Sequence, residues 1–151
     1  MKSIYLDMNI YNRPFDDQSE VRVKLETIAV FSIMKNLRGK KYNLLWSFVL
    51  DYENSLNPSD DVKKEIFLVA TVLAGKTILP DNEILIRAKW LEKKGIKPRD
   101  SLHIVCACRG GADYFITCDD DLIRKARKVI LEMEILNPVD FVREMEVRQH
   151  D

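Results

Sequence analysis

The sequence has few cysteines and histidines and no long apolar run, and each shortage excludes a class of protein or site. Its cysteines, Cys106, Cys108 and Cys118, form no C-x-x-C pair, so neither a disulfide framework nor a zinc site is indicated. Only His103 and His150 could add imidazole ligands. No stretch reaches the roughly 18–20 apolar residues of a membrane span, and an aspartate interrupts the N-terminal apolar run too early for a signal peptide. We therefore expect a soluble, cytoplasmic protein with reduced thiols.

An excess of charge of one sign is also missing. The 24 basic residues balance 24 acidic ones, which argues against broad, nonspecific coating of nucleic acid but allows a local basic track. A chain of 151 residues with 46% hydrophobic residues can build a core without staples, because a chain of this size buries roughly 68–70% of its unfolded surface. Repeats, low-complexity tracts and linkers are absent, so one domain over residues 1–151 is predicted.

Short β-rich runs alternate with helical stretches along the chain. Strands are predicted at residues 4–6, 42–46, 76–79, 114–118 and 133–136. Helices are predicted from about 20 to 38 with Asp17 or Ser19 as cap, after Ser47, after Ser59, and at 81–94, 98–109, 120–129 and from about 139. The helix at 98–109 is apolar nearly all round and should be buried. This alternation predicts a mostly parallel sheet with helices on both faces.

Two aspartates stand where a parallel sheet binds its ligands, outside the carboxyl ends of its strands. Asp7 ends the first strand and Asp119 ends the fourth. Asp7 could instead be a simple turn residue, and Asp119 could be a helix N-cap, an alternative about as strong as metal binding. Capping requires a single side-chain oxygen, however, and the three successive aspartates from Asp119 exceed that need.

Glu53 is more informative because of its helical phase. In the short helix after Ser47, positions 49, 52, 53 and 56 share one face, and Val49, Tyr52 and Leu56 make that face apolar. Glu53 should therefore point into the protein, where a carboxylate needs a partner or a cation. A lysine or arginine from elsewhere in the chain could also pair with it. Asp51 lies on the opposite side and is predicted to be an ordinary solvated acid.

Asp100 lies in the first turn of the buried helix, where an acid also interacts favourably with the helix dipole. His103 and Ala107 share its face, so Asp100 is expected to head toward the same strand ends. Four acids from four segments then converge, and such crowded oxygen ligands favour Mg²⁺ or Mn²⁺. For His103 the favoured interpretation is a core histidine bonded to a neighbour, since no second histidine stands at metal-ligand spacing.

Four segments, in order, resemble the motifs of the PIN-domain family. They are IYLDMN at residues 4–9, SFVLDYE at 47–53, RDSLHIVCA at 99–107 and FITCD at 115–119, and ILNPVDF at 135–141 is similar to the family's last strand and helix. Each motif alone is weak, but four at these spacings are specific and span nearly the whole chain. Met8 departs from the pattern, where a small or hydroxyl residue is more usual.

The resemblance implies a three-layer α/β/α sandwich with a mostly parallel five-stranded sheet, and metal-dependent hydrolysis of phosphodiester bonds with RNA as the common substrate. Many small members of the family are VapC-like toxins. These toxins are held inactive by a cognate antitoxin and usually form homodimers. By resemblance, the chain is therefore expected to be a ribonuclease with these two kinds of protein partner.

The site predicted on these grounds holds one or two Mg²⁺ or Mn²⁺ ions. Its metal-binding acids are Asp7, Glu53, Asp100 and Asp119, with Asp121 assisting. Asn9 and Thr117 are predicted to orient the carboxylates. Arg13, after Asp7, and Arg99, beside Asp100, are candidate contacts to the RNA backbone.

Two other functions compete with this one. A phospho-aspartate domain fits less well, because Asp7-Met8-Asn9 replaces the required D-x-D pair and no lysine follows the last strand in the expected place. A catalytically inert RNA-binding or interaction module of the same fold remains the alternative, although the presence of all four acids argues against it.

Overall fold

Within the residues that the structure describes, five strands form one sheet in which every neighbouring pair is parallel. The computed structural model describes residues 1–150, and the side chains of residues 1–148. The strands are β1 (Ser3–Leu6), β2 (Asn43–Ser47), β3 (Ala74–Ile78), β4 (Tyr114–Ile116) and β5 (Glu134–Leu136). Their order is β3-β2-β1-β4-β5. The predicted parallel five-stranded sheet is therefore confirmed.

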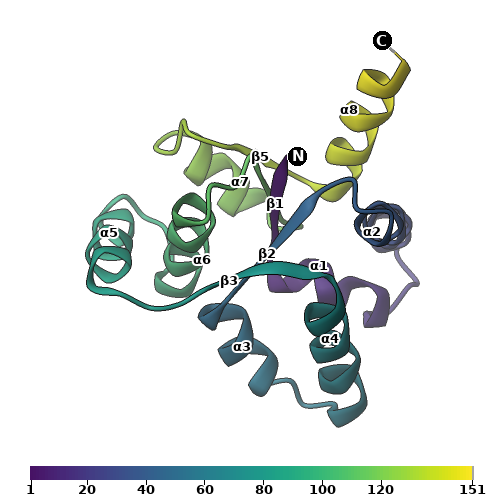
Figure 1. Ribbon diagram of the computed structural model, residues 1–151, viewed down its shortest axis with the longest axis horizontal. Coiled ribbons are helices and arrows are strands. Elements are labelled where there is room, and N and C mark those ends of the chain that lie inside the picture. The colour runs from purple at the N-terminus through teal and green to yellow at the C-terminus, as the bar shows by residue number, and fades with distance from the viewer. Residues whose placement is uncertain (151) are drawn as a thin grey trace.

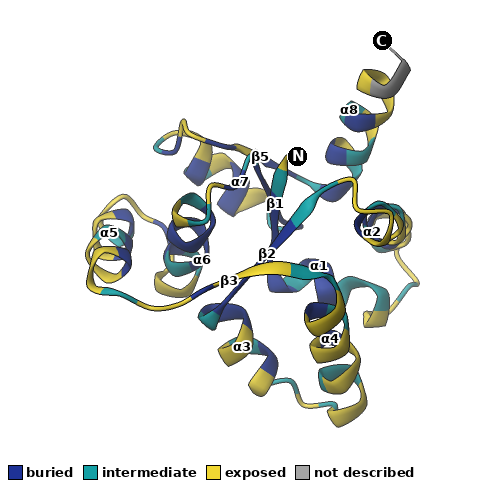
Figure 2. Ribbon diagram, viewed as in Figure 1, coloured by how far each residue is buried: buried dark blue, intermediate teal, exposed yellow. Residues whose placement is uncertain are grey.

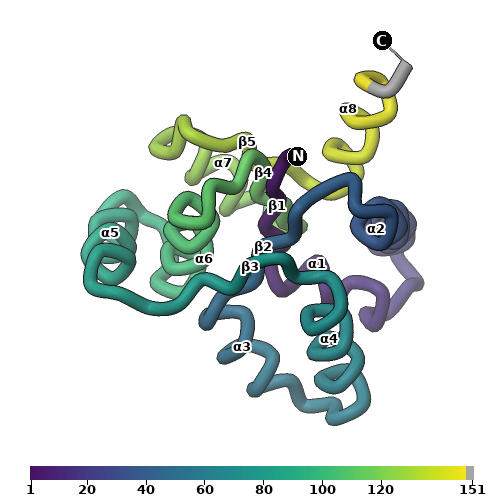
Figure 3. Tube along the Cα trace, in the orientation of Figure 1, coloured from purple at the N-terminus to yellow at the C-terminus, as the bar shows by residue number. Residues whose placement is uncertain are grey.

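Helices cover both faces of this sheet and give three layers, as predicted (Figure 1). The helices are α1 (Met8–Asn12), α2 (Val21–Arg38), α3 (Phe48–Ser55), α4 (Asp60–Leu73), α5 (Asn82–Lys93), α6 (Pro98–Arg109), α7 (Asp120–Arg127) and α8 (Pro138–His150), with a 3₁₀ turn, η1, at Arg13–Phe15. Helices α5, α6 and α7 lie on one side and α2, α4 and α8 on the other. The chain changes sides between β3 and β4, where α5 and α6 carry it back across the sheet (Figure 3).

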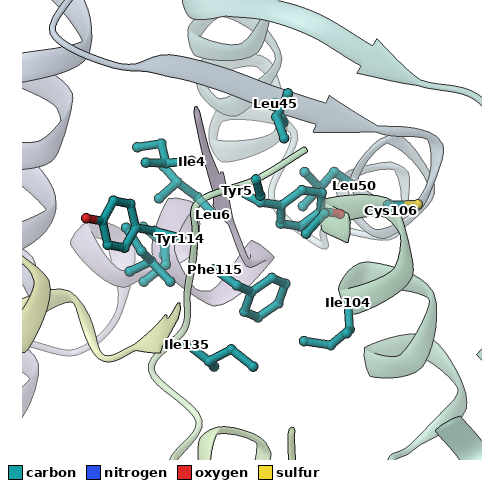
Figure 4. Packing of buried hydrophobic residues seen from close by; sticks show 14 of the residues in the cluster. Ile4, Tyr5, Leu6, Leu45, Leu50, Ile104, Cys106, Tyr114, Phe115 and Ile135 are labelled. Carbon is teal, nitrogen blue, oxygen red and sulfur yellow. The ribbon is translucent and has the colours of Figure 1, made fainter. Parts of the chain in front are cut away.

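The core lies around the two central strands. Successive residues of β1 point to opposite faces, so that Tyr5 and Phe115 lie on one side of the sheet while Ile4 and Tyr114 lie on the other (Figure 4). The rings of Tyr5 and Phe115 stack with their centroids 5.4 Å apart, and both side chains are fully buried. In the helices, buried and exposed residues lie on different faces, and α4 and α5 turn exposed faces outward (Figure 2). No helix of the described residues is long and apolar enough to cross a membrane.

Local sequence signals account for most helix boundaries. Ser47 and Ser59 cap α3 and α4 as predicted, each accepting a hydrogen bond from a backbone N–H one turn on. Pro98 begins α6, and the helix stops before Gly111, whose φ of +75° suits glycine. The predicted caps of α2 were wrong. The N-cap of α2 is Glu20, which makes no side-chain capping bond.

The sequence reading missed α1 and η1 altogether. Helix α1 has five residues, too few for a helical period to stand out, and it starts directly from the end of β1. Its buried residues are Met8, Ile10 and Tyr11, so tertiary packing rather than propensity holds it. The consequence for the site is direct, because this abrupt turn makes Asp7 the N-cap of α1.

Candidate metal centre

The predicted acids lie on segments that meet at one edge of the sheet. Strand β1 is flanked by β2 and β4, so the strand order reverses there, and ligands of parallel sheets bind at such a reversal. Asp7 follows β1, Glu53 lies on α3 after β2, and Asp119 lies just past β4. Asp100 comes from the first turn of α6. The fold therefore brings the segments that carry these four acids toward the carboxyl-end edge of the central strands.

Asp7 is buried and held by several donors. Its Oδ1 accepts a hydrogen bond from the Met8 backbone N–H at 2.8 Å, and its Oδ2 accepts one from the Thr117 hydroxyl at 2.8 Å. Burial nevertheless raises the pKa of Asp7, and the nearby Glu53 carboxylate raises it further, against the lowering effects of His103 and these hydrogen bonds. Desolvation therefore destabilises the charged form of Asp7 more than its hydrogen bonds and His103 stabilise it.

Thr117 and Asn9, which the sequence predicts to orient the carboxylates, both hydrogen-bond to Asp7. The Asn9 amide donates to Asp7 Oδ2 at 3.3 Å and to the Thr117 hydroxyl at 3.0 Å. Asn9 Oδ1 accepts from the Cys118 backbone N–H at 3.1 Å, and the Asp119 N–H donates to Thr117 Oγ1 at 3.1 Å. These bonds tie the end of β1 to the loop after β4, so they fix Asp7 relative to the backbone that carries Asp119.

Glu53 reaches the same edge, but not for the reason given by its helical phase. Tyr52 and Leu56, which were expected to define a buried face, are 55% and 54% exposed. The buried positions of α3 are Val49, Leu50 and Asn54, so Glu53 lies at the margin of the buried face and its side chain is 19% exposed. Helix α3 is short and packs against both α4 and α6, which places the margin rather than the centre of its buried face at the site.

His103 joins the two carboxylates of Asp7 and Glu53. Its Nε2 contacts Glu53 Oε1 and lies 3.7 Å from Asp7 Oδ1. One ligand atom from each of these three residues lies within 4.8 Å of the other two, an arrangement that could hold a metal ion. Burial would lower the pKa of His103, but its bond to Glu53 and the charges of Asp7 and Asp100 raise it overall. The predicted contact of His103 with a neighbour is present, and that neighbour is a candidate ligand.

Asp100 is half-buried close to the other acids. Desolvation raises its pKa to about 6, and the charges of Asp7, Asp119 and Glu53 add to the increase while His103 opposes it. Among the described residues, the ligand atoms that lie within 4.8 Å of one another belong to Asp7, Glu53 and His103, and Asp100 is not one of this group. A divalent cation would remove both the repulsion and the desolvation cost, so the donor set fits a hard metal ion.

Asp119 is the N-cap of α7, one of its two predicted roles, and its role as a metal ligand stays a prediction. Its Oδ1 accepts from the backbone N–H groups of Asp121 and Leu122 at 3.0 and 3.1 Å and so caps α7. The other carboxylate oxygen of Asp119 takes no part in that cap. The charge of Asp119 contributes to the raised pKa of Asp100. Capping therefore leaves one oxygen of Asp119 for another partner.

Asp121 does not join the other acids. Its carboxylate is exposed and pairs with Arg124 and, at 3.0 Å, with Lys125 on its own helix, which lowers its pKa. The residue stands two positions after the N-cap of α7, where its side chain meets the basic residues one turn further on. The structure therefore gives no support to its expected role in assisting the metal.

Asp51 is exposed as predicted, but it is more than a solvated acid. Its Oδ1 accepts a hydrogen bond from the Trp46 indole N–H at 2.7 Å. The bond runs from strand β2 to the first turn of α3 and lies away from the cluster formed by Asp7, Glu53 and His103. Asp51 is thus a local structural partner of Trp46.

Of the two candidate RNA contacts, Arg13 is already engaged. Its guanidinium lies 3.2 Å from the buried Glu26 carboxylate and 3.1 Å from Asp16, and its side chain is only 20% exposed. Its contact with RNA stays a prediction, which these two ion pairs do not favour. Arg99 differs, because its side chain is 51% exposed, lies 3.9 Å from Glu53 and covers the Tyr52 ring.

Glu26 anchors a network behind the site that the sequence did not indicate. Its Oε2 accepts from the Asn137 amide at 2.6 Å and from Arg22 at 3.4 Å. Arg22 also donates to both carboxylate oxygens of Asp120 and to the Cys118 carbonyl at 3.0 Å. Helix α2 is thereby bonded to the loop on which Asp119 stands. A buried glutamate on an otherwise apolar helical stripe was the only available signal.

Space beside the acids is provided by a surface cleft in which Glu53 forms part of the wall. The remaining lining residues are Met8, Asn12, Phe15, Asp16, Leu56, Asn57, Pro58, Ser59 and Val62. They come from α1, from η1 and α3 with the residues just after them, from the turn before α4, and from the first turn of α4. The cleft therefore opens between segments that the carboxyl ends of β1 and β2 place together. A substrate lying there would meet Glu53 directly.

Comparison with known proteins adds one finding. A family model described as PIN domain matches residues 4–128, which is most of the chain and includes every acid of the site. A comparison with curated proteins gave no match.

Proposed function

This chain belongs to the PIN domain family, and from that premise we propose that it is an endoribonuclease that hydrolyses RNA phosphodiester bonds with Mg²⁺ or Mn²⁺. The observation that carries the proposal is that ligand atoms of Asp7, Glu53 and His103 lie within 4.8 Å of one another. The charges of Asp7, Asp119 and Glu53 add to the desolvation that raises the pKa of Asp100. Asp7 and Asp119 also cap helices α1 and α7, but capping does not require Glu53 and His103 to lie beside Asp7. The chemistry of these carboxylates suits a divalent cation and a phosphate substrate.

In this proposal Asp7, Glu53, Asp100 and the free oxygen of Asp119 hold the metal. A divalent ion in such a site lowers the pKa of water and neutralises charge on the phosphate. Thr117 and Asn9 keep the Asp7 carboxylate in a fixed orientation through their hydrogen bonds. Arg99 stands at the exposed margin of the site, where its cation would contact an RNA phosphate.

The first prediction concerns the metal. The purified chain should cleave single-stranded RNA in Mg²⁺ or Mn²⁺ and lose that cleavage in EDTA, because the carboxylates then repel one another and have no activated water to supply. The measurement is a time course of a labelled RNA oligonucleotide, with DNA of the same sequence as the matched control for substrate class.

Three outcomes would contradict the proposal in whole or in part. Cleavage that survives exhaustive chelation would show that the metal is not required. Binding of RNA without cleavage at any metal concentration would favour the alternative, an inert RNA-binding module of the same fold. Equal cleavage of DNA would leave the nuclease intact and remove RNA from the proposal.

We further propose that the chain is a cytoplasmic toxin, that a cognate antitoxin holds it inactive, and that it forms a homodimer. This proposal is supported by apolar side chains exposed along α2 and α4, which are unusual on an unpartnered surface: Val21, Leu25, Ile28, Phe31, Phe67, Leu68 and Val72. A groove between the two helices is lined by Val30, Met34 and Val69 among others. Light scattering should give twice the 17.6 kDa mass of one chain if the purified protein is a homodimer. A monomer mass at micromolar concentration would contradict that part.

A further inference from the structure

His103 is placed as a metal ligand would be. Its side chain is 1% exposed, and it follows Asp100 by one turn on α6, so both side chains face the same edge of the sheet. The ring nitrogen Nε2 is directed at the carboxylates of Asp7 and Glu53. Nε2 of His103 and one oxygen each of Asp7 and Glu53 lie within 4.8 Å of one another. A cation that contacts both carboxylates is therefore also close to Nε2.

The other ring nitrogen is held by a buried hydroxyl. His103 Nδ1 lies 2.7 Å from the Tyr5 hydroxyl, which in turn lies 2.6 Å from Ser47 Oγ. Figure 4 shows the Tyr5 hydroxyl directed toward Leu50 and Cys106 on the α6 side of the sheet. Histidines that bind metals ordinarily use their second nitrogen in such a bond, which fixes the orientation of the ring. The orienting partner of a ligand is therefore in place.

This chain of hydrogen bonds can run in either direction. In one, Tyr5 donates to Nδ1 and the Nε2–H donates to Glu53. In the other, Nδ1–H donates to Tyr5, Tyr5 donates to Ser47, and Nε2 presents a lone pair. In that direction the Ser47 hydroxyl accepts from Tyr5 as well as from the Leu50 backbone N–H. Because both hydroxyls can rotate, the change of tautomer needs no new partner and no net gain of a proton.

We propose that His103 Nε2 binds the metal ion directly beside Asp7 and Glu53, so that the site prefers Mn²⁺ over Mg²⁺. This rests on the metal site of the proposed function and deepens it. Mg²⁺ favours oxygen ligands in near-ideal octahedra and keeps several waters, whereas first-row transition ions accept imidazole readily. A site made of carboxylates alone would show no such preference from its donors.

Pulsed electron paramagnetic resonance of the full chain loaded with Mn²⁺ tests the assignment. The wild type should show electron spin-echo modulation from a coordinated ¹⁴N nucleus. His103→Gln should remove that modulation and weaken Mn²⁺ binding by at least about 10-fold, as loss of a site partner commonly does, with a smaller effect on Mg²⁺. His150→Gln is the matched control, because it removes the chain's other histidine and should leave the spectrum unchanged.

The outcomes separate this inference from the proposed function. Mn²⁺ that binds without ¹⁴N modulation would overturn the role of His103 and leave the carboxylate metal site standing. Modulation that disappears in His150→Gln but persists in His103→Gln would overturn it equally. Failure of the wild type to bind Mn²⁺ at all would remove the metal site itself. The wild-type spectrum and the His150 control decide the question even if His103→Gln does not fold.

Discussion

Glu53→Gln is expected to lower RNA cleavage by more than about 100-fold, the upper end of the loss that outer partners of a metal site cause. Glutamine keeps the length and volume of the side chain but removes the charge that contacts His103 and faces Asp7 across the cluster. An uncharged amide oxygen attracts a divalent cation less strongly than a carboxylate does. The measurement is the initial rate of RNA cleavage at saturating Mn²⁺, together with thermal unfolding to show that the variant is folded.

Asp51→Asn is the matched control on the same helix. Asp51 lies two residues from Glu53, is exposed, and accepts a single hydrogen bond from the Trp46 indole, which an asparagine oxygen can also accept. Cleavage should therefore stay near the wild-type rate. Equal losses from the two substitutions would mean that α3 contributes through its fold rather than through the Glu53 carboxylate, and Glu53 would leave the site.

Much of the fold follows from local signals in the sequence. Helix α6 was predicted at residues 98–109 and is found at Pro98–Arg109, because a proline can begin a helix and two glycines end this one. The strands were located from β-rich runs to within two residues at either end. Parallel pairing then follows from the alternation of strands and helices, since each crossover returns the chain to the same edge.

What the sequence could not supply depends on contacts between distant segments. The buried ion pair that occupies Arg13 joins residues 13 positions apart, and no local pattern announces it. The link from Tyr5 through His103 to Glu53 spans three segments, so a histidine that looked like a core residue becomes a neighbour of the acids. Helical phase found Glu53 but assigned Tyr52 to the wrong side, because α3 is too short to fix its own buried face.

Asp7→Asn is expected to abolish cleavage and, in EDTA at neutral pH, to raise the free energy of unfolding by about 0.5–2 kcal/mol. The wild-type carboxylate is buried and its pKa is raised, so ionising it costs stability when no cation is present. An asparagine at position 7 can still accept the hydrogen bond from the Met8 N–H. Its NH₂ group, however, would face the Asn9 amide donor, which in the wild type lies 3.3 Å from Asp7 Oδ2. This contact between two donors should keep the increase in the free energy of unfolding near the lower end of the expected range.

The sign of the pH dependence follows from the same groups. Asp7 and Asp100 both have a higher pKa in the folded chain than in the unfolded one, so the folded chain binds more protons. The contribution of these two groups to wild-type stability in EDTA should therefore fall as the pH rises from about 4, the unfolded value, toward the value of about 6 at Asp100. Asp120 and Glu132, whose pKa values are lowered, contribute with the opposite sign in both proteins. Asp7→Asn removes one of these groups and lowers the repulsion at the other, so its stability should fall less over that interval.

Metal should reverse the order of the two proteins. Millimolar Mg²⁺ or Mn²⁺ stabilises whichever folded chain binds it, and the wild type should gain more than Asp7→Asn because its carboxylate cluster is complete. Thermal unfolding of both proteins, each in EDTA and in metal, gives the four values needed. A variant less stable than the wild type in EDTA, with an identical response to metal, would mean that Asp7 serves only as the N-cap of α1 and does not bind metal. In that case the three hydrogen bonds around it, rather than a cation, would be the reason for its burial.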